Sequence, residues 1–464
     1  MSKYLMIDFG STFTKLTAVD TETEDVIATS AHFTTVATDI TIGYQNALNE
    51  LYKKIGEEIS FDKVIACSSA AGGLRMAAIG LVEELTVEAA KRVCLGAGAK
   101  VDLVFSHHLT NGEIDSIVAK NIDIILLAGG TDGGNTECAI YNCKALGEKG
   151  IKIPVVFAGN KCCVDEILEI FDKYQMNGYI CENVMPKINV LNLPSARETI
   201  RGLFLNNIIE AKGIKKIEKT IDKVILPTPE AVLAACELLS KGYMHESGLG
   251  EIILVDIGGA TTDFYSMCSP SAKRSDVILK GLEEPYAKRT VEGDLGMRYS
   301  ATGIAATLSQ EEKRMYREDQ GIDIDEEAKY RNTNVDVVFS DQRGKDIDTI
   351  FAGICSDKAI SRHVGIMEEV YTPMGVLYNQ TGKDLSQVAY VLGTGGVLIH
   401  NDNPVKALKT VMANRAHMLE LRPVNPKFML DKDYLLASMG LLSSIDPLLA
   451  LKIMKKHMVE VIEK

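Results

Sequence analysis

Short apolar runs that end in Asp or a small residue, and then enter a glycine-rich turn, recur four times along the chain. They are YLMIDFGST (4–12), IILLAGGTDGG (124–134), IILVDIGGATTDF (252–264) and YVLGTGGV (390–397). In α/β proteins such strand-to-glycine junctions place backbone N–H groups at the carboxyl end of a sheet, where ligands bind. The recurrence therefore predicts several ligand-facing loops on α/β sheets.

The first and third runs match closely and predict two lobes that open with the same strand–turn–strand hairpin. The string DFGSTFT from Asp8 corresponds to DIGGATT from Asp256. In the first lobe the pattern predicts strands near 4–9, 14–20 and 25–31, then an amphipathic helix near 40–57. In the second lobe it predicts strands as far as about residue 282 and helical sequence near 297–318.

Residues 63–190 follow a different rhythm, in which apolar runs alternate with helix-prone segments. The runs are KVIACSS (63–69), VDLVFS (101–106), DIILLAGG (123–130), IPVVFAG (153–159) and GYICENV (178–184). This alternation is typical of a doubly wound parallel sheet, so we expect an inserted α/β domain. The predicted domains are a first lobe of 1–62 with 191–250, the insert at 63–190, and a second lobe of 251–464.

Two other segments are given structural interpretations. The charge-dense string SQEEKRMYREDQGIDIDEEAKYRN (309–332) is typical of a solvated helical face with a loop, and a dedicated binding surface is the less favoured alternative. From Ser443 an apolar-striped helix follows, with Asp446 and Pro447 at its start. We expect this helix to dock on the core, with partner binding as the alternative.

Composition narrows the function. The 464 residues are 46% hydrophobic and carry a formal net charge of −13, so we expect a globular protein with an acidic surface that opposes binding to nucleic acid or anionic membranes. No apolar run approaches the roughly 20 residues of a membrane span, and the start of the chain has no signal-peptide pattern. The ten cysteines contain no CxxC pair, so we expect reduced thiols and a cytoplasmic location.

The hairpin tips carry residue types that bind phosphate. Their glycines let the backbone approach closely and present N–H donors, and hydroxyl groups add further donors. The hydroxyl residues are Ser11, Thr12, Thr261 and Thr262. Asp8 and Asp256, at strand ends, can hold the waters of a Mg²⁺ ion, and Lys15 can neutralise phosphate charge. One such hairpin would be a common turn, but two matching hairpins point to a nucleotide site.

Five segments of the sequence, taken in order, resemble the five motifs of the actin, Hsp70 and sugar-kinase superfamily. These are phosphate-1 (7–15), connect-1 PTPEAVLAACELL (227–239), phosphate-2 VDIGGATTDF (255–264), adenosine VLGTGG (391–396) and connect-2 LLASMGLL (435–442). The small residues Ala231, Ala234, Ala235, Ala437 and Gly440 fit the close helix crossing that the connect motifs form. The resemblance implies an α/β fold of two actin-like ATPase lobes, of ribonuclease H-like topology, with an inserted flavodoxin-like α/β subdomain.

The same resemblance implies roles for individual residues toward ATP and Mg²⁺. The phosphates would be bound by Gly10, Ser11, Thr12 and Lys15 from one lobe and by Gly258, Gly259, Thr261 and Thr262 from the other; Gly393, Gly395 and Gly396 would back the adenosine. Asp8 and Asp256 would position hydrated Mg²⁺. Glu230 would orient the attacking water, and an ordinary carboxylate in the first turn of a helix is its alternative interpretation.

Within the superfamily, the strings MIDFGSTFTK, LLAGGTDGGNTE and DIGGATTDFYS, with RTVEGDLGMRYSA, resemble the glutamate mutase accessory (GlmL/MutL) family. That resemblance implies a chaperone that reactivates an adenosylcobalamin-dependent mutase: ATP closes the lobes, hydrolysis resets them, and damaged cobalamin leaves the client. The expected partners are mutase subunits, including the small cobalamin-binding subunit. A small-molecule kinase and an actin-like filament protein are the alternatives, since fold does not settle function.

The insert leads to four further expectations. It is reminiscent of the cobalamin-binding module of such mutases, so we expect it to mimic or dock against the small subunit. The Asp-x-His-x-x-Gly string of cobalt-ligating modules is missing around His107 and His108, so no cobalamin bound through a histidine is expected. Cys162 and Cys163, with Cys138 and Cys143 nearby, lack the usual cluster spacing, which favours buried thiols over an iron–sulfur cluster. The loop at 129–134 is expected to face a ligand or a partner, with neither preferred.

Overall fold

The computed structural model describes residues 2–10, 13–34, 40–69, 74–211, 221–373 and 375–463. By their internal contacts these residues form two compact units, unit 1 (Met1–Ala231) and unit 2 (Val232–Lys464). Each unit is described by itself below.

The first sheet of unit 1 has the strand order β3-β2-β1-β4-β10. Its strands are β1 (Lys3–Phe9), β2 (Phe13–Asp20), β3 (Asp25–Phe33), β4 (Lys63–Ser68) and β10 (Lys223–Pro227), and helix α1 (Ile40–Ile55) packs on β2 and β3. β1, β2 and β3 pair antiparallel, whereas β4 runs parallel to both β1 and β10. The three strands and the helix predicted for the start of the chain are confirmed.

The second sheet of unit 1 is parallel throughout and has the order β6-β5-β7-β8-β9. Its strands are β5 (Arg75–Gly80), β6 (Lys100–Ser106), β7 (Ile124–Leu127), β8 (Val155–Phe157) and β9 (Gly178–Ile180). The connecting helices are α2 (Glu88–Gly96), α3 (Asn111–Ala119), α4 (Glu137–Glu148) and α5 (Val164–Tyr174). With its first strand in second place, this is the flavodoxin-like order, which confirms the predicted class of the insert.

One predicted boundary differs from the structure. β4, expected to open the insert at residue 63, instead pairs with β1, so Asp8 lies beside Cys67 in the first sheet. The first strand of the insert is β5, RMAAIG, which the sequence analysis missed because its small residues read as helix-prone. The chain returns to the first sheet through α6 (Pro194–Ala211), which contacts both α2 and β10.

The main sheet of unit 2 repeats the design of the first sheet. Its order is β16-β14-β13-β19-β20-β21, from β13 (Ile252–Ile257), β14 (Thr262–Met267), β16 (Ala287–Glu292), β19 (Tyr390–Thr394), β20 (Lys427–Asp431) and β21 (Met458–Val461). As in unit 1, an antiparallel hairpin is followed by two strands parallel to the first. The shared order and directions confirm two lobes of ribonuclease H-like topology, to which unit 2 adds β21 as an edge.

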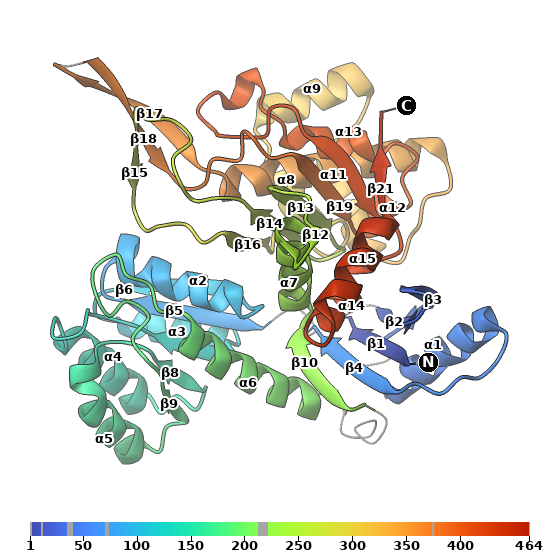
Figure 1. Ribbon diagram of the computed structural model, residues 1–464. Coiled ribbons are helices and arrows are strands. Elements are labelled where there is room, and N and C mark those ends of the chain that lie inside the picture. Colours follow the sequence, from blue (N-terminus) through green and yellow to red (C-terminus); the bar gives the residue numbers. More distant parts are fainter. Residues whose placement is uncertain are drawn as a thin grey trace. The chain divides into compact units, whose positions relative to one another are not determined.

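The helices of unit 2 separate into buried and solvated ones. α8 (Ala301–Ala306) and α11 (Gln342–His363), which lie beside the main sheet (Figure 1), contribute to the main hydrophobic core. α9 (Gln310–Gln320) has no buried residue, and α10 (Ile324–Thr333) buries few, as predicted for the charged stretch. The C-terminal helix is α15 (Pro447–His457), capped by the Asp446 side chain, and its buried residues confirm core docking. The predicted helix was too long, because Met458–Val461 forms strand β21 instead.

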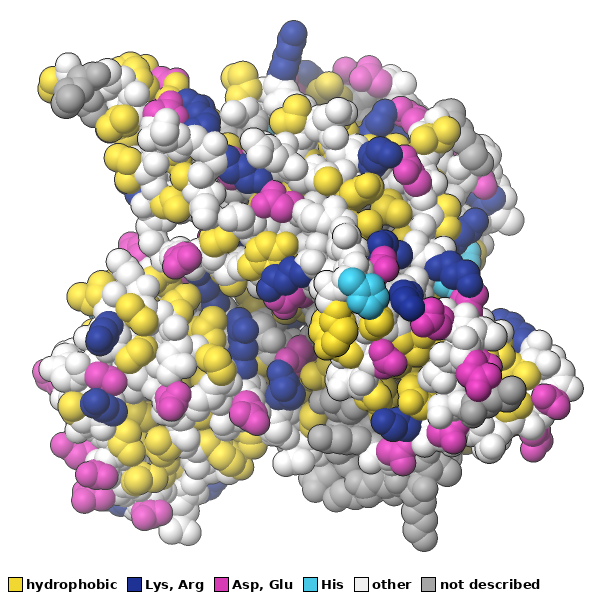
Figure 2. Space-filling view, viewed as in Figure 1, with side chains coloured by type: hydrophobic (Ala, Val, Ile, Leu, Met, Phe, Trp, Pro, Cys, Tyr) yellow, Lys and Arg dark blue, Asp and Glu magenta, His cyan; other side chains and the backbone are white. Residues whose placement is uncertain are grey.

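A separate three-stranded sheet, in the order β15-β18-β17, was not predicted. It consists of β15 (Val277–Lys280), β17 (Ile366–Thr372) and β18 (Gly375–Thr381). The β17–β18 hairpin extends away from the rest of unit 2 (Figure 1), and hydrophobic side chains lie on its surface (Figure 2). The exposed apolar residues of this sheet include Ile278, Leu279, Tyr371 and Val376.

Candidate functional site

The two matching hairpins share their register and the hydrogen bond that closes the turn. In unit 1 the N–H of Gly10 donates to the Phe13 carbonyl at 3.0 Å, and in unit 2 that of Gly258 donates to Thr261 at 2.9 Å. A Cβ atom on Gly10 would lie 2.5 Å from the Phe13 oxygen, so only glycine fits there. The predicted phosphate ligands Ser11 and Thr12 lie outside the described residues.

Asp8 lies at the carboxyl end of β1 and is only 5% exposed. The Thr228 hydroxyl, at the start of α7 (Thr228–Lys241), donates to its Oδ1 at 2.7 Å, and the Cys67 thiol approaches the same oxygen at 3.5 Å. Lys15, half-buried, is opposite Asp8 in the register. Unit 1 therefore brings together a predicted carboxylate, a predicted cation and a hydroxyl that the sequence analysis did not single out.

The carboxylate of Glu230 is held by Arg201 of α6, whose Nε donates to Oε2 at 2.9 Å while Nη2 donates to Oε1. Burial raises the pKa of Glu230, and the guanidinium of Arg201 opposes that rise. This bidentate partner was missed because it lies on another helix, outside any local pattern. Glu230 is thus a fixed and nearly buried carboxylate in the first turn of α7.

In unit 2 the phosphate-2 loop is held by backbone contacts from residues 297–299. The N–H groups of Arg298 and Tyr299 donate to the Gly259 carbonyl at 2.8 and 2.9 Å, and that of Met297 to Gly258 at 3.1 Å. Because the carbonyls are bound from one side, the loop has a fixed shape before any ligand arrives. Such preorganisation suits close approach of an anion to the backbone.

The hydroxyl groups of the two threonines of this loop differ in burial and in their hydrogen-bond partners. The Thr262 hydroxyl is fully buried and donates to the Leu295 carbonyl at 2.6 Å, so it stabilises the loop. The Thr261 hydroxyl is half-buried and lies 3.3 Å from Asp263 Oδ2. Of the two predicted hydroxyl donors, Thr261 is the one placed to exchange its partner for a phosphate.

The three glycines of the adenosine motif have different surroundings. Gly393 is packed among Leu398, Leu408 and Leu430, so it belongs to the core. Gly395 has φ +98°, and a Cβ atom there would lie 2.2 Å from the Ile257 carbonyl. A Cβ atom on Gly396, at the start of α12 (Gly396–Ile399), would lie 3.3 Å from the Tyr434 hydroxyl. Gly395 is therefore required by the close approach of the Ile257 backbone and is itself buried, whereas Gly396 is exposed and open to a ligand.

Three polar residues end the parallel strands β13, β19 and β20 of unit 2: Asp256, Thr394 and Asp431. Thr394 Oγ1 donates to Asp431 Oδ2 at 3.3 Å, and Asp431 also accepts the backbone N–H groups of residues 435 and 436. Burial, with Asp256 and Asp431 nearby, raises the pKa of Tyr434. Asp431 was missed, although its place after the strand KFMLD matches the rule that found Asp8 and Asp256.

The carboxylates fit a hydrated magnesium ion rather than a dedicated metal cage. Among the described residues, no group of three or more His, Cys, Asp or Glu side chains could hold a metal. Mg²⁺ keeps several waters and uses one or two carboxylates together with substrate phosphates. Asp8, held by two uncharged donors, suits that outer-sphere role.

At the carboxyl end of the insert sheet, the loop at residues 129–135 is fixed by two buried asparagines. Asn160 accepts the N–H of Gly133 and donates to the carbonyls of Gly134 and Asn135, at 3.1–3.2 Å. Asn183 donates to the Gly130 carbonyl at 3.1 Å and to Asp132 at 2.9 Å. The loop is therefore a rigid feature at the edge where ligands or partners bind parallel sheets.

The histidines and most cysteines of the insert have structural surroundings. Cys162 is exposed, so the expectation of a buried thiol is wrong at that position. The His108 ring stacks on Tyr141 with centroids 4.2 Å apart, and His107 adopts φ +61° at the end of β6. Cys143 and Cys163 are buried, and burial raises their pKa values to about 12 and about 11, so they are neutral thiols. Neutral buried thiols are poor cluster ligands, since metals bind thiolates.

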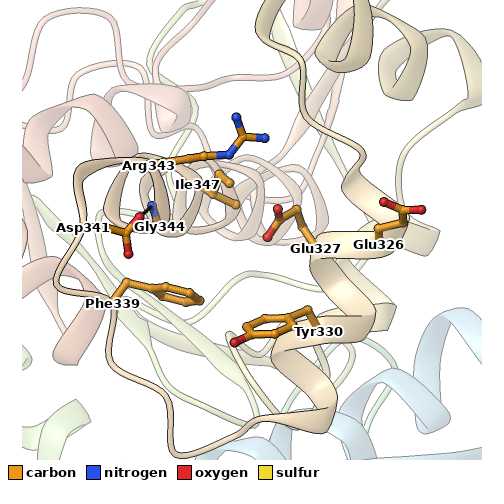
Figure 3. A pocket seen from close by; sticks show the side chains of 8 residues that line it. All are labelled: Glu326, Glu327, Tyr330, Phe339, Asp341, Arg343, Gly344 and Ile347. Carbon is orange, nitrogen blue, oxygen red and sulfur yellow. Dashed lines mark hydrogen bonds between the residues drawn. The ribbon is translucent and has the colours of Figure 1, made fainter.

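A pocket of about 380 Å³ lies between α10 and the start of α11 (Figure 3). Its lining residues are Glu326, Glu327, Tyr330, Phe339, Asp341, Arg343, Gly344 and Ile347. Several of its charged groups already have partners: Glu327 binds Arg331 at 2.6 Å, and Asp341 accepts the N–H of Gly344 at 2.9 Å. None of the predicted site residues lines it.

In the described part of the chain, no helix combines the length and apolarity of a membrane span.

Some solved structures resemble the chain weakly. They include component A of the (R)-2-hydroxyglutaryl-CoA dehydratase of Acidaminococcus fermentans (10% identity, 98% of this chain and 99% of that chain, TM-score 0.32). A diol dehydratase-reactivating factor in nucleotide-free form shares 10% identity over 96% of this chain and 99% of that chain, with TM-score 0.37. With TM-scores this low, the fold assignment rests on the strand orders above and not on these structures.

The sequence comparisons are much stronger. A family model described as "MutL protein" matches residues 4–458. The Protein MutL of Clostridium tetanomorphum is 50% identical over 462 residues, which cover 99% of this chain and 100% of that relative. Both matches span the two units and the insert, so the chain belongs to the MutL family, the family of glutamate mutase accessory proteins.

Proposed function

We propose that the protein is an ATP-dependent reactivating factor for an adenosylcobalamin-dependent mutase of the glutamate mutase type, acting in the cytoplasm. Family membership supports the association with a mutase. The observation that carries the ATPase function is the repeated hairpin, in which Asp8 and Asp256 take the same register position and a glycine N–H two residues later closes the turn with the same hydrogen bond. The ten free cysteines, nine of them buried, suit a reducing compartment.

In this proposal each hairpin binds phosphate through backbone N–H groups, with hydroxyls and Lys15 as further donors. Asp8 and Asp256 hold water molecules of a bound Mg²⁺ ion, which would neutralise charge on the phosphates. Glu230 orients the attacking water, because Arg201 fixes its carboxylate in one direction. Gly395 and Gly396 back the adenosine.

The work on the client comes from a difference in affinity between nucleotide states. A factor that binds the mutase more tightly in one state than in the other can loosen the closed cobalamin site without covalent chemistry. The proposed docking surface is the carboxyl edge of the insert sheet, where the rigid loop at 129–135 meets the small cobalamin-binding subunit. Its fixed shape supports docking, because little ordering entropy is lost when the partner binds.

The test is ATP hydrolysis by the purified protein, with and without mutase that has been inactivated by cobalamin damage. We expect the inactivated mutase to stimulate turnover and to release its cobalamin only with ATP and Mg²⁺. Asp8→Asn and Asp256→Asn should each abolish turnover without unfolding the chain. Asp20→Asn, at the far end of β2 where Asp20 stabilises a turn, is the matched control. Turnover that ignores the mutase but responds to a sugar or a small acid would instead indicate a kinase.

A further inference from the structure

Thr228 reaches Asp8 across an intervening strand. It follows β10 directly and begins α7, while Asp8 is on β1, and β4 lies between the two strands. Even so, its hydroxyl donates to Asp8 Oδ1 at 2.7 Å, between residues 220 positions apart in the chain. This hydrogen bond spans β4 at the carboxyl end of the sheet and fixes the rotation of the Asp8 carboxylate. Contacts between neighbours in the chain do not fix that rotation.

Among the described residues, the two side chains that donate to the Asp8 carboxylate are uncharged, and Lys15 lies opposite Asp8 in the register. Besides the Thr228 hydroxyl, the Cys67 thiol approaches Oδ1 at 3.5 Å, and burial together with Asp8 raises the pKa of Cys67 well above its usual range. Two other carboxylates of the protein are held by guanidinium groups, Glu230 by Arg201 and Asp263 by Arg289. Asp8 thus keeps its negative charge uncancelled by these two donors while being fixed in orientation.

We propose that Thr228 is a positioning residue, which orients the Asp8 carboxylate toward the waters of the magnesium–nucleotide complex. The inference deepens the proposed ATPase function and rests on it. Uncharged donors suit this task, because a cation bound to Asp8 would compete with the metal for the same charge. The hydroxyl also ties the first residue of α7 to the phosphate-binding hairpin of unit 1.

The test compares Thr228→Val, which keeps the shape but removes the hydroxyl, with Thr228→Ser, which keeps the hydroxyl. Thr333→Val is the matched control, since the Thr333 hydroxyl bonds only the Lys329 carbonyl of its own helix. In Thr228→Val we expect kcat to fall about 10- to 100-fold, the value for losing a hydrogen bond to a charged group. The half-saturating Mg²⁺ concentration should rise, while KM for ATP at saturating Mg²⁺ changes by less than about threefold. Thr228→Ser should restore wild-type kcat and Mg²⁺ dependence.

The outcomes separate this inference from the proposed function. If wild-type protein hydrolyses ATP and Asp8→Asn does not, but Thr228→Val equals wild type, the positioning role is overturned and the ATPase stands. The positioning role is also overturned if Thr228→Ser loses as much kcat as Thr228→Val. The same holds if lower thermal stability fully explains the loss of kcat in Thr228→Val. If wild-type protein shows neither hydrolysis nor Mg²⁺-dependent binding of ADP, both the proposed function and the positioning role are wrong.

Discussion

Asp263 forms a buried ion pair with Arg289 of the adjacent strand, with Nη2 2.6 Å from Oδ1 and Arg289 only 6% exposed. Asp263 lies opposite Asp256 in the register of its hairpin, the position that Lys15 takes opposite Asp8 in the other hairpin. The hairpins therefore match in backbone but not in charge. Opposite Asp8 one hairpin places a lysine, and opposite Asp256 the other places a carboxylate that a buried arginine neutralises.

Removing Arg289 should therefore be costly. Arg289→Met leaves Asp263 without its cation, and we expect the free energy of unfolding to fall by about 3–5 kcal/mol, measured by urea denaturation. The double variant Asp263→Asn/Arg289→Met should recover most of that loss. Arg274→Met, which breaks the exposed pair with Asp276, should cost less than about 1 kcal/mol. A double variant as unstable as Arg289→Met would show that packing, and not charge, explains the loss.

A buried lysine predicts a pH dependence of stability. The ammonium of Lys383 donates to the carbonyls of Ser266, Pro285 and Tyr286, and burial lowers its pKa from 10.5 to about 8. Between these values the unfolded chain holds the proton and the folded chain does not, so this contribution to stability rises with pH. Below about pH 8 the lysine is charged in both states, and the penalty for the buried charge is complete.

The measurement compares wild type with Lys383→Met at about pH 7 and about pH 9.5 by urea denaturation. The difference in unfolding free energy, wild type minus variant, should increase with pH by about 2 kcal/mol over this range. Lys280→Met, on the exposed strand β15, should show no such trend. A difference that is constant with pH would mean that Lys383 keeps its charge throughout this range.

The hairpins could be predicted from the sequence because their determinants are local. Short apolar runs define the strands, and the glycines between them, such as Gly10, permit the close turn. The parallel sheet of the insert was recognisable for the same reason, as apolar runs at regular intervals. Such runs do not indicate to which sheet a strand belongs. The run KVIACS of β4 is recognisable as a buried strand, but only its pairing with β1 assigns it to the first lobe.

Other elements lack a local signal. α11 is buried on nearly all sides, so its sequence shows no polar face from which a helix could be recognised. The partners of the candidate site come from far along the chain: Thr228 for Asp8, and Arg201 for Glu230. Residue types at strand ends predict which carboxylates are candidates for the site, but they do not predict which side chains orient those carboxylates.

Glu230 and Arg201 predict a pH dependence of activity. If Glu230 orients the attacking water, Glu230→Gln should lower kcat about 100-fold or more, whereas Glu237→Gln, on the same helix but exposed, should not. The carboxylate must be ionised, so turnover falls as pH drops through its pKa. Because Arg201 opposes the rise in the pKa of Glu230, Arg201→Gln should move this acid limb to higher pH. Normal kcat in Glu230→Gln would leave the ion pair a purely structural role.

The loop of the insert gives a prediction about the client. Asn160 is fully buried, and replacing it with Ala removes the side-chain bonds to Gly133, Gly134 and Asn135 at once. We expect faster amide exchange across 129–135, unchanged basal ATP hydrolysis, and loss of stimulation by the inactivated mutase. Asn192→Ala, which removes an exposed hydrogen bond to Glu182, is the control. If exchange increases while stimulation stays at the wild-type level, the client does not dock on this loop, because docking on a rigid surface is weakened when that surface must first be ordered.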